Sequence, residues 1–143
     1  MNKLFVTVLG ACLVSMLAAC GAGGGGDAAV DGSPEGLAVQ YRQSVMRSLG
    51  YKVAAVRAMA TGEVPVDEAK FRKDTADVAA LAGMLPEGFI PSSSSTESNA
   101  NPEVRTNMAD FQQKAADLKN AAGALAATAA SQGFEAAKGM VEA

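Results

Sequence analysis

Apolar side chains recur every three or four residues along two long segments of this 143-residue chain, and this spacing constrains the fold most strongly. Such a period places the apolar groups on one face of an α-helix, and that face must be buried against other helices. The first stripe comprises Leu37, Tyr41, Val45, Leu49, Val53, Val56 and Ala60, and the second Val104, Met108, Phe111, Ala115, Leu118, Ala122, Leu125 and Ala129. The chain is also rich in Ala and Gly, which suits closely packed helices better than a sheet. We therefore predict an all-α fold.

Capping residues set the expected helix boundaries. An N-cap residue followed by a proline and an acid begins the first and third segments, at Ser33 and Asn101, whereas Asp67 caps the second. We predict three antiparallel helices over about 34–61, 67–85 and 102–131, with a short fourth helix from about Phe134. The polar stretch 91–100 is expected to be a surface crossover loop.

The N-terminus is typical of an exported protein. Residues 1–19 contain one basic residue and then an apolar run, as in a signal peptide. Leu17-Ala18-Ala19-Cys20 resembles the box of bacterial lipoproteins, which implies lipidation of Cys20 and a protein anchored in the periplasm, at the outer membrane. An ordinary signal peptide with a chance Cys is the alternative. Residues 20–32 would then form a Gly-rich tether and 33–143 the folded domain.

Charge and residue types exclude several functions. The net charge is −3, so the basic footprint of a nucleic-acid-binding protein is absent and we expect no nucleic-acid partner. The four serines 92–95 have no His anywhere in the sequence to act as their base. We expect a protein that is not an enzyme.

Two side chains near the start of the first segment suggest a ligand site. Arg42 and Met46 lie one helical turn apart, beside the apolar stripe. A cation next to a flexible apolar group suits a flat cofactor with acidic edges. The alternative is ordinary: Met46 fills the core and Arg42 extends to water.

Several motifs together resemble the cytochrome c-prime family, the class II c-type cytochromes. They occur in the family's order and spacing: Tyr41-Arg42-Gln43-Ser44-Val45-Met46, Gly62-Glu63-Val64-Pro65-Val66-Asp67, Met84-Leu85-Pro86 with Phe89, and Asn101-Pro102-Glu103-Val104. The resemblance implies an up-down-up-down four-helix bundle, here with a shortened fourth helix. It also implies a periplasmic homodimer carrying haem c, with a role in electron transfer or in binding NO or CO.

The resemblance also implies roles for four residues. Arg42 matches the family Arg that pairs with a haem propionate, and Gln43 matches its neighbour at the haem edge. Met46 matches the apolar residue over the distal iron face, and Phe89 an aromatic of the pocket wall.

One family feature is missing from this sequence. The family's haem is attached through Cys-x-x-Cys-His on the last helix, but no such motif and no His are present. Two hypotheses follow. The chain is a cytochrome c-prime whose haem segment is missing here, or it is a haem-free lipoprotein bundle that acts as an interaction or ligand-binding module. In either case we expect apolar surface where a full fourth helix would lie, which favours dimerisation. Nothing in the sequence identifies a redox partner.

Overall fold

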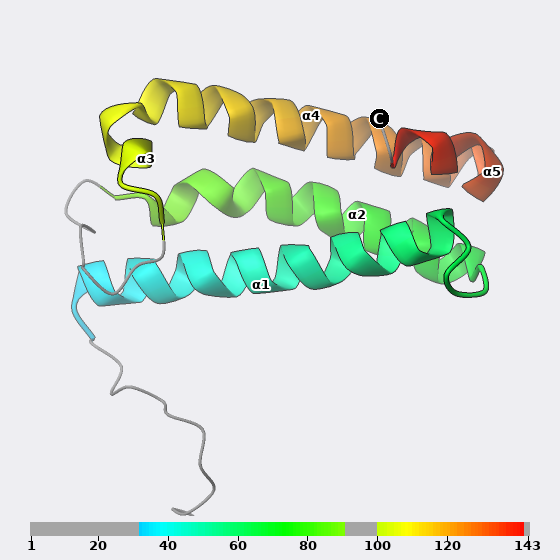
Figure 1. Ribbon diagram of the computed structural model, residues 1–143, viewed down its shortest axis with the longest axis horizontal. Coiled ribbons are helices and arrows are strands. Elements are labelled where there is room, and N and C mark those ends of the chain that lie inside the picture. Colours follow the sequence, from blue (N-terminus) through cyan, green and yellow to red (C-terminus); the bar gives the residue numbers. More distant parts are fainter. Residues whose placement is uncertain (1–31, 91–99, 142–143) are drawn as a thin grey trace, which may run out of the picture.

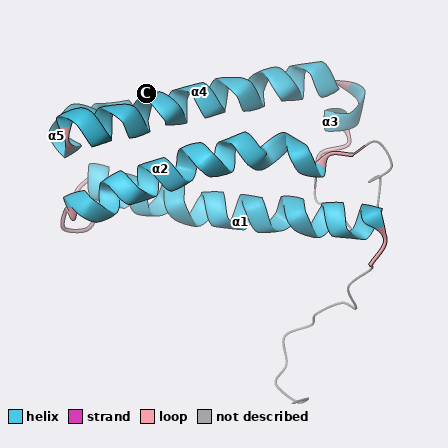
Figure 2. Cartoon of the chain, turned by 180° about the vertical axis from the view of Figure 1, so that it is seen from behind, coloured by secondary structure: helices cyan, strands magenta, loops and turns pink. Residues whose placement is uncertain are grey.

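Three long helices form the body of the protein in the computed structural model, which describes residues 32–90 and 100–141. They are α1 (Pro34–Ala60), α2 (Glu68–Met84) and α4 (Met108–Gln132). Shorter helices connect or follow them: η1 (Leu85–Gly88), α3 (Glu103–Thr106), α5 (Phe134–Ala137) and η2 (Lys138–Met140). The chain direction alternates between successive long helices, and α2 lies between α1 and α4 and packs against both (Figures 1 and 2). The all-α prediction is confirmed.

The helix ends follow from local hydrogen bonds. The side chain of Ser33 accepts a hydrogen bond from the backbone N–H of Gly36 at 3.1 Å, and that of Asp67 accepts one from the N–H of Lys70 at 2.9 Å. At the other end of α1, Gly62 takes a positive φ of 77°, which only glycine adopts readily. The predicted starts and ends of the first two helices are therefore correct to within a residue.

The third predicted helix is wrong in one respect. Residues 102–131 were expected to be continuous, but Asn107 leaves the helical region, with φ −121° and ψ 45°, and separates α3 from α4. Asn is among the residues whose side chains favour non-helical backbone near helix ends. The apolar period continues across the break, so the period alone does not reveal it. The short fourth helix from Phe134 is observed as α5.

The buried face of α1 is rotated from the predicted stripe. Val45, Leu49 and Val56 are buried as expected, but Leu37 and Val53 are exposed. Their places in the interior are taken by residues of the adjacent face: Ala38, Val39, Arg42 and Met59. The period predicts that a helix has a buried face, but the position of α2 and η1 decides which residues that face contains.

The apolar interior is best formed at the end of the bundle where α5 lies. Phe71 of α2 and Phe134 of α5 meet edge to face, with ring centroids 4.9 Å apart. Around them pack Val56, Met59, Leu125, Ala129 and Ala137. A second cluster at mid-bundle consists of Leu49, Val78, Ala82 and Ala122. The many alanines on α4 allow it to approach α2 closely.

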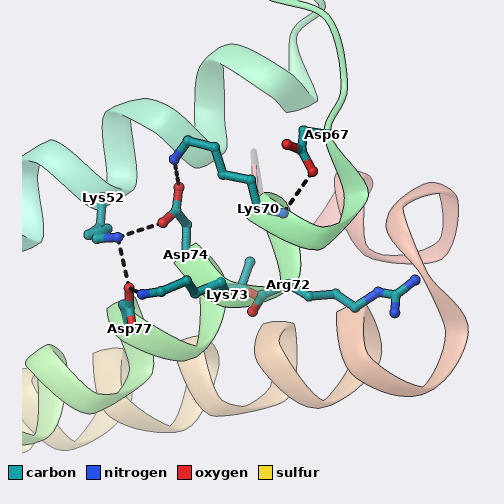
Figure 3. Close-up of polar contacts among 8 residues, drawn as sticks. Lys52, Asp67, Lys70, Arg72, Lys73, Asp74 and Asp77 are labelled. Carbon is teal, nitrogen blue, oxygen red and sulfur yellow. Dashed lines mark hydrogen bonds and ion pairs between the residues drawn. The ribbon is translucent and has the colours of Figure 1, made fainter.

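An ion-pair network joins α1 to α2 (Figure 3). Lys52 of α1 contacts carboxylate oxygens of Asp74 at 2.6 Å and of Asp77 at 2.7 Å. Lys70 also pairs with Asp74, and Lys73 pairs with Asp77 at 2.7 Å. Only 1% of the Asp74 side chain is exposed, so its charge depends on these two ammonium groups.

The network lowers the pKa of both carboxyl groups. Burial alone would raise the pKa of Asp74, but hydrogen bonds from Lys52 and Lys70 outweigh it, so the pKa of Asp74 is lowered. Hydrogen bonds from Lys52 and Lys73 lower the pKa of Asp77 to about 2. A carboxyl group whose pKa is lower in the folded state stabilises that state above its unfolded pKa of about 4. This stabilisation is lost as the pH falls toward 2.

The first prediction tests this linkage with Asp77→Asn. We expect the variant to be less stable than the wild type at pH 6. It should also lose stability less steeply between pH 4 and pH 2, because Asn has no carboxyl group whose protonation favours the unfolded state. Urea unfolding followed by circular dichroism at each pH measures this. Asp117→Asn is the control, because Asp117 is exposed and accepts a hydrogen bond from the neutral amide of Gln113. Parallel pH profiles for wild type and Asp77→Asn would contradict the prediction.

Candidate functional site: a pocket beside Arg42

The guanidinium of Arg42 is buried at the end of the bundle opposite α5. Only 6% of this residue is exposed. Its Nη1 donates a hydrogen bond to the carbonyl oxygen of Gly88 at 2.8 Å, and its Cζ lies 4.8 Å from the centroid of the Phe89 ring. A buried charge is costly unless polar or aromatic groups compensate for lost water, and these two contacts do so.

The segment around η1 is held against α1 by close contacts. At Gly88 an added Cβ would lie 2.4 Å from Cγ of Arg42, 3.0 Å from Cδ1 of Tyr41 and 3.1 Å from the carbonyl oxygen of Ala38. Only a glycine fits there without displacing the arginine. The hydroxyl of Tyr41 also donates a hydrogen bond to Glu87 at 2.5 Å, and this bond raises the pKa of Tyr41.

A pocket of about 530 Å³ opens beside Arg42. Segments far apart in the sequence meet here: α1, the residues after η1, α3 and the first turns of α4. The lining residues are Arg42, Phe89, Ile90, Ala100, Asn101, Val104, Arg105, Met108 and Gln112. Phe89 is further braced by Phe111, whose ring centroid is 4.5 Å away. The pocket thus has apolar walls and a few polar groups, as ligand sites commonly do.

The pocket lining carries positive charge. Among the described residues that line it, two are arginines and none is acidic. Burial lowers the pKa of Arg42, and the nearby charge of Arg105 lowers it further. An anion placed between the two guanidinium groups would relieve this repulsion, so the site is suited to a ligand that is apolar over most of its surface and negatively charged at one edge.

The structure brings together two of the four predicted site residues. Arg42 and Phe89 are in contact and line the pocket. Gln43 is exposed on α1, and Met46 is 56% exposed. Neither lines the pocket. The buried face of α1 contains Arg42, and the side of the helix with Gln43 and Met46 is exposed. Their roles at a haem edge and at a distal iron face stay predictions.

Several lining residues were not anticipated from the sequence. Arg105 had the appearance of a surface cation on a long predicted helix, and Met108 was assigned to a core stripe. Gly88 carried no motif at all. The available signal was the polar loop before Asn101, since loops at the ends of a bundle often hold binding residues.

The fold and the pocket define a class: a helical bundle with a pocket at one end that is lined by apolar side chains and two arginines. The family model described as Cytochrome C' matches residues 37–143, and the chain belongs to the cytochrome c′ family. That family consists of haem proteins rather than enzymes, so the expectation of a non-enzymatic protein is confirmed.

Curated relatives and solved structures agree with this assignment. The chain is 34% identical over 89 residues to cytochrome c-556 of Agrobacterium fabrum, and 35% over 77 residues to cytochrome c-556 of Agrobacterium tumefaciens. These matches cover 62% and 54% of the chain, and they span only about three-fifths of those relatives, 60% and 61%.

Among solved structures, cytochrome c prime from Shewanella frigidimarina matches with a TM-score of 0.70 and 30% identity, covering 76% of this chain and 84% of the other. Cytochrome c′ from Rubrivivax gelatinosus matches with a TM-score of 0.69 and 27% identity, covering 76% and 85%. The predicted four-helix-bundle class is confirmed by these structures.

The second prediction tests the close approach at Gly88. We expect Gly88→Ala to displace Arg42 and to lower the free energy of unfolding by about 1–3 kcal/mol, as overpacking does. Gly50→Ala is the matched control. Gly50 lies in the exposed middle of α1 with nothing within 4 Å of an added Cβ, so alanine there should stabilise the protein by roughly 0.5–1 kcal/mol. Equal effects of the two substitutions in urea unfolding would show that the contact does not position Arg42.

Proposed function

We propose that this domain supplies the haem pocket of a cytochrome c′-type protein of the periplasm. The observation that carries the proposal is Arg42, buried against Gly88 and Phe89 on a pocket whose described lining has a second arginine and no acid. Haem is flat and apolar with two propionates on one edge, so its charge distribution matches this lining. Membership in the cytochrome c′ family supports the same ligand.

The residues present fit the edge of haem but not its iron. The sequence contains no His, and both of its cysteines, Cys12 and Cys20, lie outside the described residues. No group of His, Cys, Asp or Glu that could hold a metal occurs among residues 32–90 and 100–141. We therefore derive no electron-transfer or gas-binding step from these side chains; their part is to receive an acidic, apolar molecule and orient it.

The second candidate is the haem-free bundle, a lipoprotein that binds another ligand or partner. The lining also suits this candidate, since two arginines and apolar walls can receive an acidic ligand that contains no iron. Both candidates use the same pocket, and they differ in whether iron protoporphyrin is the occupant.

The third prediction separates these candidates. Given the residues present, we expect the polypeptide to hold haem without a covalent bond, because none of the described residues that line the pocket has a thiol. Haemin titration should give a saturable change in the Soret absorption, and acid acetone should then remove all haem before a pyridine haemochrome assay. Haem that stays with the denatured polypeptide would refute the non-covalent mode. Failure of haemin to bind at concentrations of tens of micromolar would leave the haem-free candidate.

We also propose that the protein is held at the outer membrane through lipidated Cys20. The proposal rests on Leu17-Ala18-Ala19-Cys20 at the end of the apolar run 4–19. Cys20 lies outside the described residues. In the described part of the chain no helix has the length and apolar character to cross a bilayer. A multiply acylated cysteine would anchor the protein stably without one.

The fourth prediction is that Cys20→Ser moves the protein out of the membrane fraction. A serine hydroxyl offers no thiol for the thioether to the lipid, so the protein should be recovered without its anchor. Fractionation of cells followed by immunoblotting measures this. Cys12→Ser is the control, because Cys12 lies inside the apolar run and not at its end. An unchanged membrane fraction for Cys20→Ser would rule out this anchor.

A homodimer is the partner we propose. Met46 and Val53 on α1 and Leu118 on α4 are large apolar side chains exposed to solvent. Burying them against a second copy would remove apolar surface from water. Sedimentation equilibrium over a range of protein concentrations tests this, and a monomer at all of them would contradict it.

A further inference from the structure

Arg105 supplies the second positive charge of the pocket lining. It lies on α3, the four-residue helix that Asn107 separates from α4. Local bonds fix this turn. The side chain of Asn101 accepts a hydrogen bond from the N–H of Glu103 at 2.9 Å, and the N–H of Arg105 donates to the carbonyl of Pro102 at 3.1 Å. The backbone that carries the second guanidinium is therefore defined by the chain itself.

Arg105 lines the pocket together with Arg42, although it lies on the short helix α3 and not on a long one. In the observed structure α3 is a separate turn, and residues on both sides of the break line the same pocket: Asn101, Val104 and Arg105 before it, and Met108 and Gln112 after it. Both arginines line this pocket, and burial first and the charge of Arg105 second lower the pKa of Arg42.

The lining also limits what kind of molecule can fill the pocket. A small inorganic anion would meet the two arginines but leave the apolar walls formed by Phe89, Val104 and Met108 in contact with water. A neutral apolar molecule would cover the walls but offer no negative charge to the two guanidinium groups that line the pocket. An organic acid with an apolar body satisfies both parts, and the amides of Asn101 and Gln112 offer further hydrogen bonds.

We propose that Arg42 and Arg105 together bind the carboxylate of an amphipathic organic acid, whose apolar body lies against Phe89, Val104 and Met108. This goes beyond the haem proposal in two ways: it needs no iron, and it assigns Arg105 as a residue that determines specificity for acids over their neutral analogues. Porphyrin dicarboxylates and fatty acids share this chemistry.

The experiment compares acids with their uncharged counterparts. The probes are metal-free protoporphyrin IX and its dimethyl ester, and laurate and dodecanol, each titrated into the full chain. Arg105→Gln removes the charge of a solvent-exposed side chain, so the fold should persist, and circular dichroism checks this. Arg72→Gln is the matched control, because Arg72 is also exposed and pairs with Glu68 on α2, away from the pocket lining.

We expect Arg105→Gln to weaken the binding of the acid about tenfold, as loss of one charge-assisted hydrogen bond does, and to leave binding of the neutral analogue unchanged. Arg72→Gln should change neither. The acid that binds more tightly to the wild type identifies the ligand class. Equal weakening for acid and neutral analogue, no effect of Arg105→Gln, or no binding of either acid would each overturn the proposal. If the acids bind through Arg105 while haemin does not bind more tightly than metal-free protoporphyrin, the haem proposal fails and this one stands.

Discussion

The buried guanidinium of Arg42 is the constraint on which the ligand-binding end of this protein depends. A charge removed from water needs compensation, and here one backbone carbonyl and one aromatic ring provide it. Both groups belong to the segment after α2, so Arg42 fixes the path of the chain as it leaves the second helix. Gly88 permits that path because any side chain at this position would collide with the arginine.

The two ends of the bundle are stabilised by different forces. At one end α5 places Phe134 against Phe71, and the interior there is apolar and closed. At the other end the interior contains a cation, and the space beside it is a pocket. Between them, Lys52 links α1 to the buried Asp74 of α2. The central helix α2 therefore contributes to the apolar core and to an ion-pair network, and it leads directly into η1, on which Arg42 depends.

Much of the architecture could be predicted from the sequence because it is determined locally. Ser33 and Asp67 cap their helices through bonds to residues three positions away, so short motifs reveal them. The face that α1 buries could not be predicted as well. Leu37 and Val53 fit the helical period as closely as Val45 does, but only the packing of α2 and η1 against α1 distinguishes them. At the site, Arg42 and Phe89 were identified through a family resemblance, and their contact across 47 positions of sequence is a tertiary property.

Arg105 shows why a ligand site is harder to infer than a fold. The residue differs from the exposed cations of α2 and α4 in nothing that its neighbours in sequence reveal. Its place beside Arg42 in the pocket lining depends on how α3 lies at the end of the bundle. The break at Asn107 between α3 and α4 leaves the apolar period of Val104, Met108 and Phe111 intact. A pattern that tolerates the break cannot report it. The positive charge of the pocket comes from side chains on two elements far apart in the sequence, α1 and α3, and no local pattern shows that the fold brings these elements to one site.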